Sequence, residues 1–141
     1  MGVQATSKVR TSSAKRHGMM HAAVVWIEIP TKDVPGSARF YERVFGWSVF
    51  ADDNTPGYER FLDRSGHMAG AFTLQGEPAG ARGVRVVIQV DDLRNTLERV
   101  LREGGRVVAE PSIEPMGSGL WASFEDPAGN VLSIYGGPDR L

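Results

Sequence analysis

The hydrophobic pattern of the chain changes between a period of two and a period near 3.6. Two β-branched runs, at about 23–29 and 84–90, are typical of strands. After each run, apolar residues recur at spacings of three and four, which indicates one buried face of a helix. These helical positions are Val34, Ala38, Tyr41 and Phe45 in the first stretch and Leu93, Leu97, Val100 and Leu101 in the second.

Capping residues predict where both helices begin and end. Asp33 and Asp92 lie where a helix start favours a carboxylate that accepts backbone N–H bonds. Gly46 and the pair at 104–105 lie where a helix ends, because glycine tolerates the left-handed conformation of a C-cap.

Three short strands are expected after each helix, since turn residues separate the remaining apolar stretches. Each half of the chain is therefore a βαβββ unit. A βαββαβ ferredoxin-like sandwich is the nearest alternative, and the third strand after each helix argues against it. The stretches lie at about 47–51, 57–63 and 67–74, and at about 106–109, 119–125 and 130–135.

The two halves are also similar residue by residue. A shift of 59 positions maps Asp33 onto Asp92, and a shift of 63 maps Asp63 onto Asp126. An internal repeat of this length indicates a duplicated supersecondary unit, with a short loop inserted in the second copy.

Composition favours one globular domain. The chain has 141 residues, 41% of them hydrophobic, a formal net charge of -1 and no Cys. These values give no sign of nucleic acid or membrane partners, and they exclude disulfides and thiol chemistry. We expect a cytoplasmic protein with a disordered basic leader at 1–20, a domain at 21–137 with modules at about 22–76 and 82–137, and a tail at 138–141.

Two sequence phrases carry a family resemblance, FYERVFGW at 40–47 and DPAGN at 126–130. Over residues 22–137 the chain resembles the vicinal-oxygen-chelate superfamily, the glyoxalase and bleomycin-resistance group. The resemblance implies an α+β fold in which two βαβββ modules form a cupped, curled mixed sheet. It also implies a small organic ligand inside the cup and a homodimer.

Many members of that superfamily hold a divalent metal in the cup. The resemblance places the metal ligands in the first and last strand of each module. Counting from the helix-opening and turn aspartates gives Trp26, Gly70, Arg85 and Ser133. None of these is an imidazole or a carboxylate, which such sites require, so we expect no metal and no other cofactor.

Strand alternation predicts what lines the cup instead, because every second side chain of a strand shares a face. The set is aromatic and apolar with a few polar groups, as in a small-molecule pocket. The expected ligand-binding residues are Trp26, Glu28, Phe72, Arg85, Gln89, Trp121, Ser133 and Tyr135; Tyr58, Arg60, Met68, Gly70, Val87, Ser123 and Val131 are also expected on this face.

Several of these residues have a second interpretation. Arg85 either holds a ligand carboxylate or phosphate or forms an ion pair with Glu28. Trp26 and Trp121 either stack on a ligand or fill the core or a dimer interface.

The leading hypothesis is a metal-independent protein that binds or sequesters a small drug or metabolite, without catalysis. The alternative is a divergent lyase, isomerase or dioxygenase that uses non-standard metal ligands or Glu28 as a general base.

Overall fold

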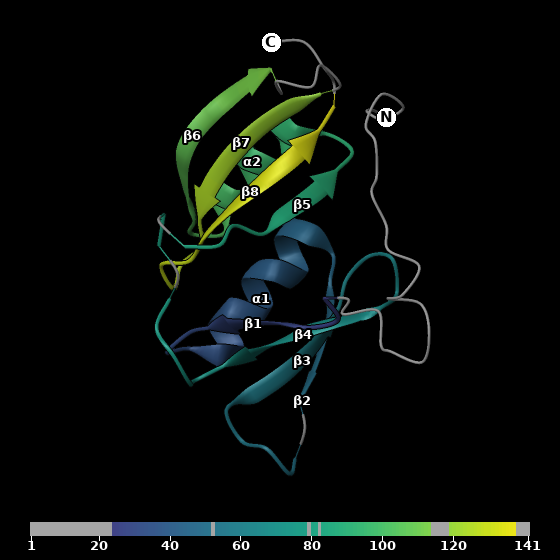
Figure 1. Ribbon diagram of the computed structural model, residues 1–141, viewed down its shortest axis with the longest axis vertical. Helices are drawn as coiled ribbons and strands as arrows, with labels where there is room; N and C mark the ends of the chain where they lie inside the picture. Colours follow the sequence, from purple (N-terminus) through teal and green to yellow (C-terminus); the bar gives the residue numbers. More distant parts are fainter. Residues whose placement is uncertain (1–23, 52, 79, 82, 114–118, 138–141) are drawn as a thin grey trace, which may run out of the picture.

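The chain folds into two modules with the same order of elements (Figure 1). The computed structural model describes residues 24–137 apart from 52, 79, 82 and 114–118. The expected leader at 1–20 and tail at 138–141 therefore lie outside the described residues. The first module contains β1 (Ile27–Pro30), α1 (Val34–Phe45), β2 (Ser48–Ala51), β3 (Tyr58–Leu62) and β4 (Met68–Thr73); the second contains β5 (Val87–Val90), α2 (Leu93–Arg102), β6 (Arg106–Ile113), β7 (Leu120–Glu125) and β8 (Val131–Gly136).

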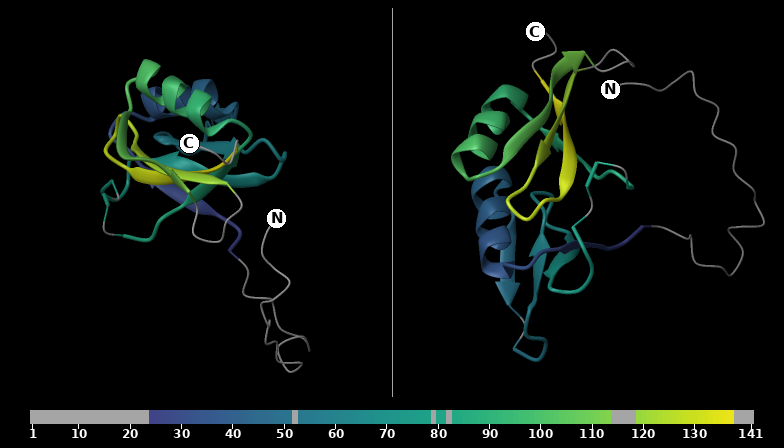
Figure 2. Two further views of the ribbon diagram at one scale, coloured as in Figure 1. Left: turned by 90° about the horizontal axis from the view of Figure 1, so that it is seen from above. Right: turned by 90° about the vertical axis from the view of Figure 1, so that its left-hand side faces the viewer.

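Each module has one four-stranded mixed sheet, with the orders β1-β4-β3-β2 and β5-β8-β7-β6. The first strand of each module pairs in parallel with the last, and the other neighbours are antiparallel. Both helices lie on the same side of the two sheets (Figure 2, left). The prediction of an α+β fold made of two βαβββ modules is confirmed.

The helix caps form as the sequence predicts. The carboxylate of Asp33 accepts a bond of 3.1 Å from the N–H of Gly36, and that of Asp92 accepts one of 3.1 Å from Asn95. Gly46 ends α1 with φ 73°. In α2 the C-cap is Glu103 (φ -95°), and the left-handed residue is the next one along the chain.

An aromatic cluster fills the space between α1 and the first sheet. Tyr41 stacks on Trp47 with ring centroids 4.9 Å apart, and Trp47 stacks on Phe61 at 4.5 Å. Phe72 lies 5.0 Å from Phe61 and is fully buried. These rings and the buried face of α2 share one core, so the two modules fold around common packing.

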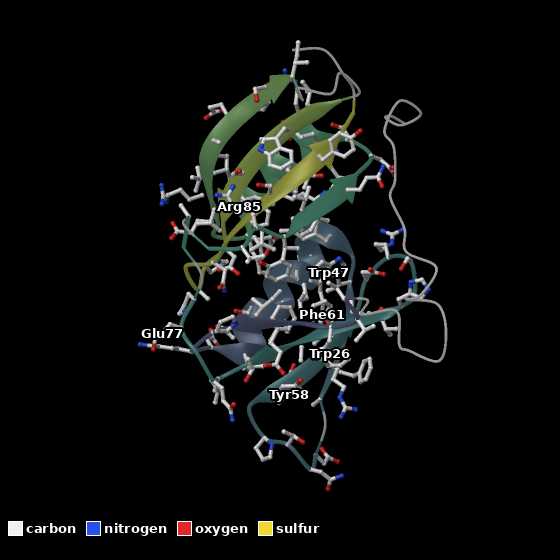
Figure 3. All side chains as sticks on the ribbon, in the orientation of Figure 1. Trp26, Trp47, Tyr58, Phe61, Glu77 and Arg85 are labelled. Carbon is white, nitrogen blue, oxygen red and sulfur yellow. The ribbon has the colours of Figure 1, made fainter. Side chains whose placement is uncertain are left out.

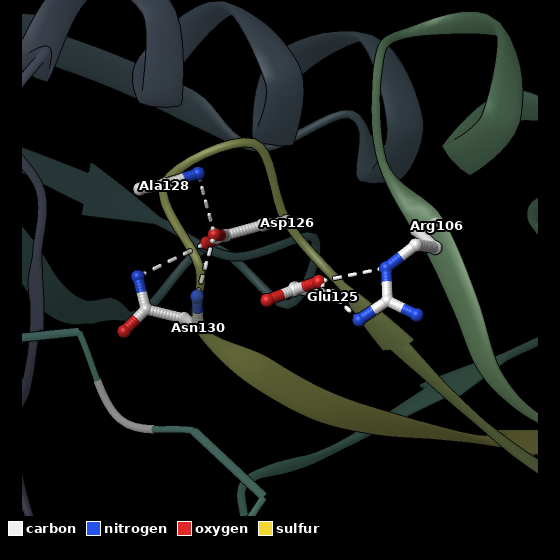
Figure 4. Close-up of polar contacts among 5 residues, drawn as sticks. All are labelled: Arg106, Glu125, Asp126, Ala128 and Asn130. Atoms are coloured by element: carbon white, nitrogen blue, oxygen red, sulfur yellow. Dashed lines mark hydrogen bonds and ion pairs between the residues drawn. The ribbon is translucent and has the colours of Figure 1, made fainter.

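The turn at 126–130, whose internal contacts Figure 4 shows, also contacts the first module. Asp126 accepts bonds of 2.9 Å from the N–H groups of Ala128 and Asn130, which close the turn. The same carboxylate accepts a hydrogen bond of 2.8 Å from the hydroxyl of Tyr41 in α1. The amide of Asn130 reaches the carbonyl of Pro30 in β1 at 2.8 Å. The DPAGN turn thus links the two modules through the contacts of Asp126 with Tyr41 and of Asn130 with Pro30, and we call this set of contacts the clasp.

Strand β6 runs further than the sequence predicts. It extends to Ile113, past Pro111, with irregular register between Val107 and Ser112. Since β6 is an edge strand, Pro111 removes no necessary ladder bond. The first strands are shorter than expected, so that Trp26 and Arg85 lie just before β1 and β5.

A register shift in β4 contradicts part of the predicted cup lining. The pairing of β3 with β4 slips by one residue between Phe61 and Leu62, and a slip of one residue exchanges the two faces of a strand. Phe72 therefore pairs beside Ile29 and packs in the core under α1. The expectation that Phe72 and Gly70 line the cup is wrong; the side chain of Met68 lies outside the described residues.

Within the described chain, no helix has the length and apolar character to cross a membrane.

Candidate functional site

The first module carries a hydrogen-bonded chain of three side chains on the sheet face opposite α1. The indole N–H of Trp26 donates to the hydroxyl of Tyr58 at 3.0 Å, and that hydroxyl donates to Oε2 of Glu28 at 2.7 Å. Figure 3 shows Trp26 and Tyr58 close together over the first sheet. The sequence had placed all three on one face, but their bonding order was not foreseen.

Tyr58 is held in its neutral, proton-donating form. Burial of the phenol raises its pKa, and its bond to the Glu28 carboxylate raises the pKa further. Tyr58 is therefore a hydrogen-bond donor to Glu28 rather than a base at neutral pH.

The second module presents Arg85 at the corresponding position (Figure 3). Its Nη1 donates to Oγ of Ser123 at 3.3 Å and to Oγ of Ser133 at 3.2 Å. Its Nη2 donates to the carbonyl of Ala81 in the linker between the modules at 3.0 Å. Nε is buried without a hydrogen-bond partner. The two serines are buried and lie 2.9 Å apart, so they form a polar floor under the guanidinium.

Aromatic side chains flank this floor. Trp121 and Tyr135 are direct neighbours across β7 and β8. They lie two residues along these strands from Ser123 and Ser133, and therefore on the same face. Both rings are half-buried, and neither belongs to the aromatic core. Gln89 pairs beside Tyr135 and is exposed. The predicted face of the second module is thus brought together as expected.

Glu28 and Arg85 do not form the ion pair that was one interpretation of their positions. Glu28 bonds to Tyr58, while Arg85 bonds to serines and a backbone carbonyl. The two charged residues serve separate halves of the face.

The positions that correspond to the metal ligands of the resemblance offer no usual ligand. Because of the slip in β4, the residue of the first module that is equivalent to Ser133 is Ala71 rather than Gly70. Ala71 pairs with Glu28 in the first module, just as Ser133 pairs with Val87 in the second. In the described residues, no group of three or more His, Cys, Asp and Glu side chains surrounds a common point. Indole, methyl, guanidinium and hydroxyl groups do not fit a divalent cation.

Two clefts lie outside this face. One of about 610 Å³ runs between the modules beside Ile27, Trp47 and Ile88. Another of about 630 Å³ is lined by Thr31, Arg39 and other residues near the start of α1. Of the predicted ligand-binding residues, only Gln89 borders either cleft. Trp26 and Arg85 are half-buried and Glu28 and Gln89 are exposed, so the face that carries them is accessible to solvent in the single chain.

Paired βαβββ modules with an open sheet face define a recognisable class of α+β protein. The Glyoxalase/Bleomycin resistance protein/Dioxygenase superfamily matches residues 14–134, and the chain belongs to this family.

The similar proteins include a biosynthesis protein, an enzyme and an antibiotic binding protein. The chain is 30% identical over 128 residues to the anthracycline biosynthesis protein DnrV of Streptomyces peucetius, covering 80% of this chain and 46% of that relative. Its fold is similar to a glyoxalase-related enzyme from Fulvimarina pelagi (TM-score 0.66, 23% identity, 83% of this chain and 89% of that one). It is also similar to TnmS3, an antibiotic binding protein from Streptomyces sp. CB03234 (TM-score 0.64, 18% identity, 83% and 97%).

Proposed function

We propose that this protein binds a small organic molecule on the open sheet face and does so without a metal ion. The observation that carries the proposal is the arrangement of the second module, where Arg85 lies over two buried serines beside Trp121 and Tyr135. An aromatic surface with a few convergent polar groups is the usual composition of a small-molecule site. The antibiotic-binding description of TnmS3 supports a drug or metabolite as the ligand.

A thermal-shift screen of aromatic compounds and antibiotics, anthracyclines included, tests the proposal on the full chain. A ligand at 100 times its Kd should add about 2.7 kcal/mol to the free energy of unfolding. Trp121→Ala should abolish the shift, while Leu101→Ala should leave it unchanged, because Leu101, whose spacing predicts the buried face of α2, is exposed in the structure. A screen without any stabilising compound contradicts the proposal.

Metal content is measured on the same untagged protein by plasma mass spectrometry. We expect no stoichiometric metal, and no change in ligand affinity after treatment with a chelator. One equivalent of Zn, Ni, Mn or Fe per chain would contradict the metal-free proposal and favour an enzyme with new ligands.

In an enzymatic alternative, Glu28 would accept a proton from a bound substrate, and the hydrogen bond from Tyr58 would hold its carboxylate in place. Glu28→Gln separates the two functions. An enzyme should lose turnover and keep substrate affinity, whereas a binding protein should show no turnover in either form.

A further inference from the structure

Arg85 is a partly buried cation without an anion. Its three partners, the hydroxyls of Ser123 and Ser133 and the carbonyl of Ala81, are all neutral. Across the described residues, Arg85 has no ion pair. Its Nε is also buried without a partner. Such a charge is costly unless an anion compensates it.

A purely structural role explains this arrangement poorly. Arg85 does connect the linker at Ala81 to the second sheet. A neutral carbonyl, however, is a weaker acceptor for a guanidinium than a carboxylate, which accepts two parallel charge-assisted bonds. A ligand carboxylate therefore competes well against the carbonyl of Ala81 for the Nη2 group of Arg85.

We infer that Arg85, on the floor made by Ser123 and Ser133, is the binding site for the carboxylate of an aromatic acid. The inference rests on the proposed function and deepens it, since it names the chemical class of the ligand. The aromatic part of the ligand packs on Trp121 and Tyr135, the neighbouring residue pair of the same face.

The spacing of the two pairs limits the distance between ring and carboxylate. Trp121 and Ser123 are two residues apart on β7, which is about 7 Å along a strand. The ring site and the carboxylate site are therefore close together, which favours a carboxylate attached directly to the ring. The ligand class is thus a benzoate-type acid.

Charge favours a carboxylate over a phosphate ester. Arg85 contributes one positive charge at this floor, and its hydrogen-bond partners among the described residues are uncharged. One carboxylate balances that charge, whereas a phosphate dianion leaves one negative charge uncompensated. Phosphate esters are therefore the second arm of the test.

The probe pair is 2-naphthoate and its uncharged amide, 2-naphthamide, titrated into the full chain and measured by calorimetry and amide chemical shifts. Wild-type protein should bind the acid at least about 10-fold more tightly than the amide. Arg85→Gln should weaken binding of the acid by about 10- to 100-fold and leave the amide unchanged. Arg94→Gln, which removes one exposed charge from α2, should bind both compounds as the wild type does.

Stability without ligand gives an independent measurement. If Arg85 serves the ligand, Arg85→Gln should keep or raise the melting temperature, because it removes an uncompensated charge. A clear loss of stability would overturn the inference in favour of a structural clamp. Should Arg85→Gln fail to fold, Arg85→Lys keeps the charge but lacks the bidentate fork, and it should bind the acid at least about fivefold more weakly.

Three further results would overturn the inference. They are equal binding of acid and amide to the wild type, undiminished binding of the acid to Arg85→Gln or Arg85→Lys, and tighter binding of 2-naphthyl phosphate than of 2-naphthoate. Binding of neutral compounds alone would overturn this inference and leave the proposed function standing. Absence of binding by all three compounds would overturn this inference, whereas the proposed function falls only if the thermal-shift screen also gives no stabilising compound.

Discussion

Asp126 is a buried carboxylate at the junction of the two modules. Burial raises its pKa, while bonds from Asn130, Tyr41 and Ala128 lower it and leave a net rise. Because its folded pKa is raised, Asp126 contributes stability fully below its unfolded pKa, and this contribution is lost as the pH rises through the folded pKa. The contribution of Asp126 to the free energy of unfolding therefore decreases as the pH rises from the acidic range through its raised pKa.

Tyr41→Phe should weaken this clasp. The change removes the hydroxyl that donates to Asp126 and leaves the ring in the core. We expect a loss of about 1.5–3 kcal/mol in the free energy of unfolding, measured by urea denaturation near neutral pH. The pKa of Asp126 should rise further, which carboxyl carbon NMR measures directly.

A matched control is Tyr58→Phe, which removes the same hydroxyl from the open face. Tyr58→Phe should lower the free energy of unfolding by less than about 1 kcal/mol, because water can replace the Tyr58 hydroxyl as the exposed hydrogen-bond donor to Glu28. Equal losses in the two variants, or a lower pKa of Asp126 in Tyr41→Phe, would contradict the role given to the clasp.

At the scale of elements, the sequence predicted the helix starts and the faces of β7 and β8, because short-range patterns determine both. The aspartate caps fixed both helix starts, and alternation placed Trp121, Ser133 and Tyr135 correctly because β7 and β8 pair without a slip. Alternation failed in β4, where the run at 69–71 consists of small residues and gives no signal of the face they occupy. The large apolar side chain of Phe72 was the one signal in this strand that favoured the core face, where Phe72 is fully buried.

The parallel pairs of each module depend on a glycine at the point of closest approach. A Cβ at Gly136 would lie 1.9 Å from the carbonyl of Val90, and one at Gly70 would lie 2.0 Å from that of Ile27. Gly136→Ala should force β5 and β8 apart and cost about 2–3 kcal/mol of unfolding free energy.

Gly80→Ala is the control, because nothing lies within 4 Å of its added Cβ. We expect a change within about 0.5 kcal/mol. Similar stabilities for Gly136→Ala and Gly80→Ala, measured by chemical denaturation, would show that the strands tolerate the extra methyl group.

At the scale of the whole molecule, the sheet face that carries Trp26 and Arg85 is open in one chain. Large apolar residues remain exposed in the segments that enter β1 and β5, and such groups favour association. They are Val24, Val25, Val84 and Val87.

We propose that a second copy of the chain covers this face. Light scattering should then give twice the chain mass of 15.3 kDa. Val87→Glu, at an exposed residue of β5 that pairs beside Ser133, should raise the dissociation constant at least about 10-fold, whereas Leu101→Glu, at an exposed residue of α2, should not. A mass of one chain at all concentrations would remove the proposed dimer.

The duplicated frame carries different groups at equivalent points, with Trp26 and Glu28 in one half and Arg85 and Val87 in the other. A receptor with two identical halves would accept an elongated guest in either direction. A guest that spanned both halves would meet the Glu28 carboxylate at one end and the Arg85 guanidinium at the other, so its head and tail would be distinguished. The different side chains of the two repeated modules thus give the scaffold a direction, because the two ends of such a guest would meet chemically different groups.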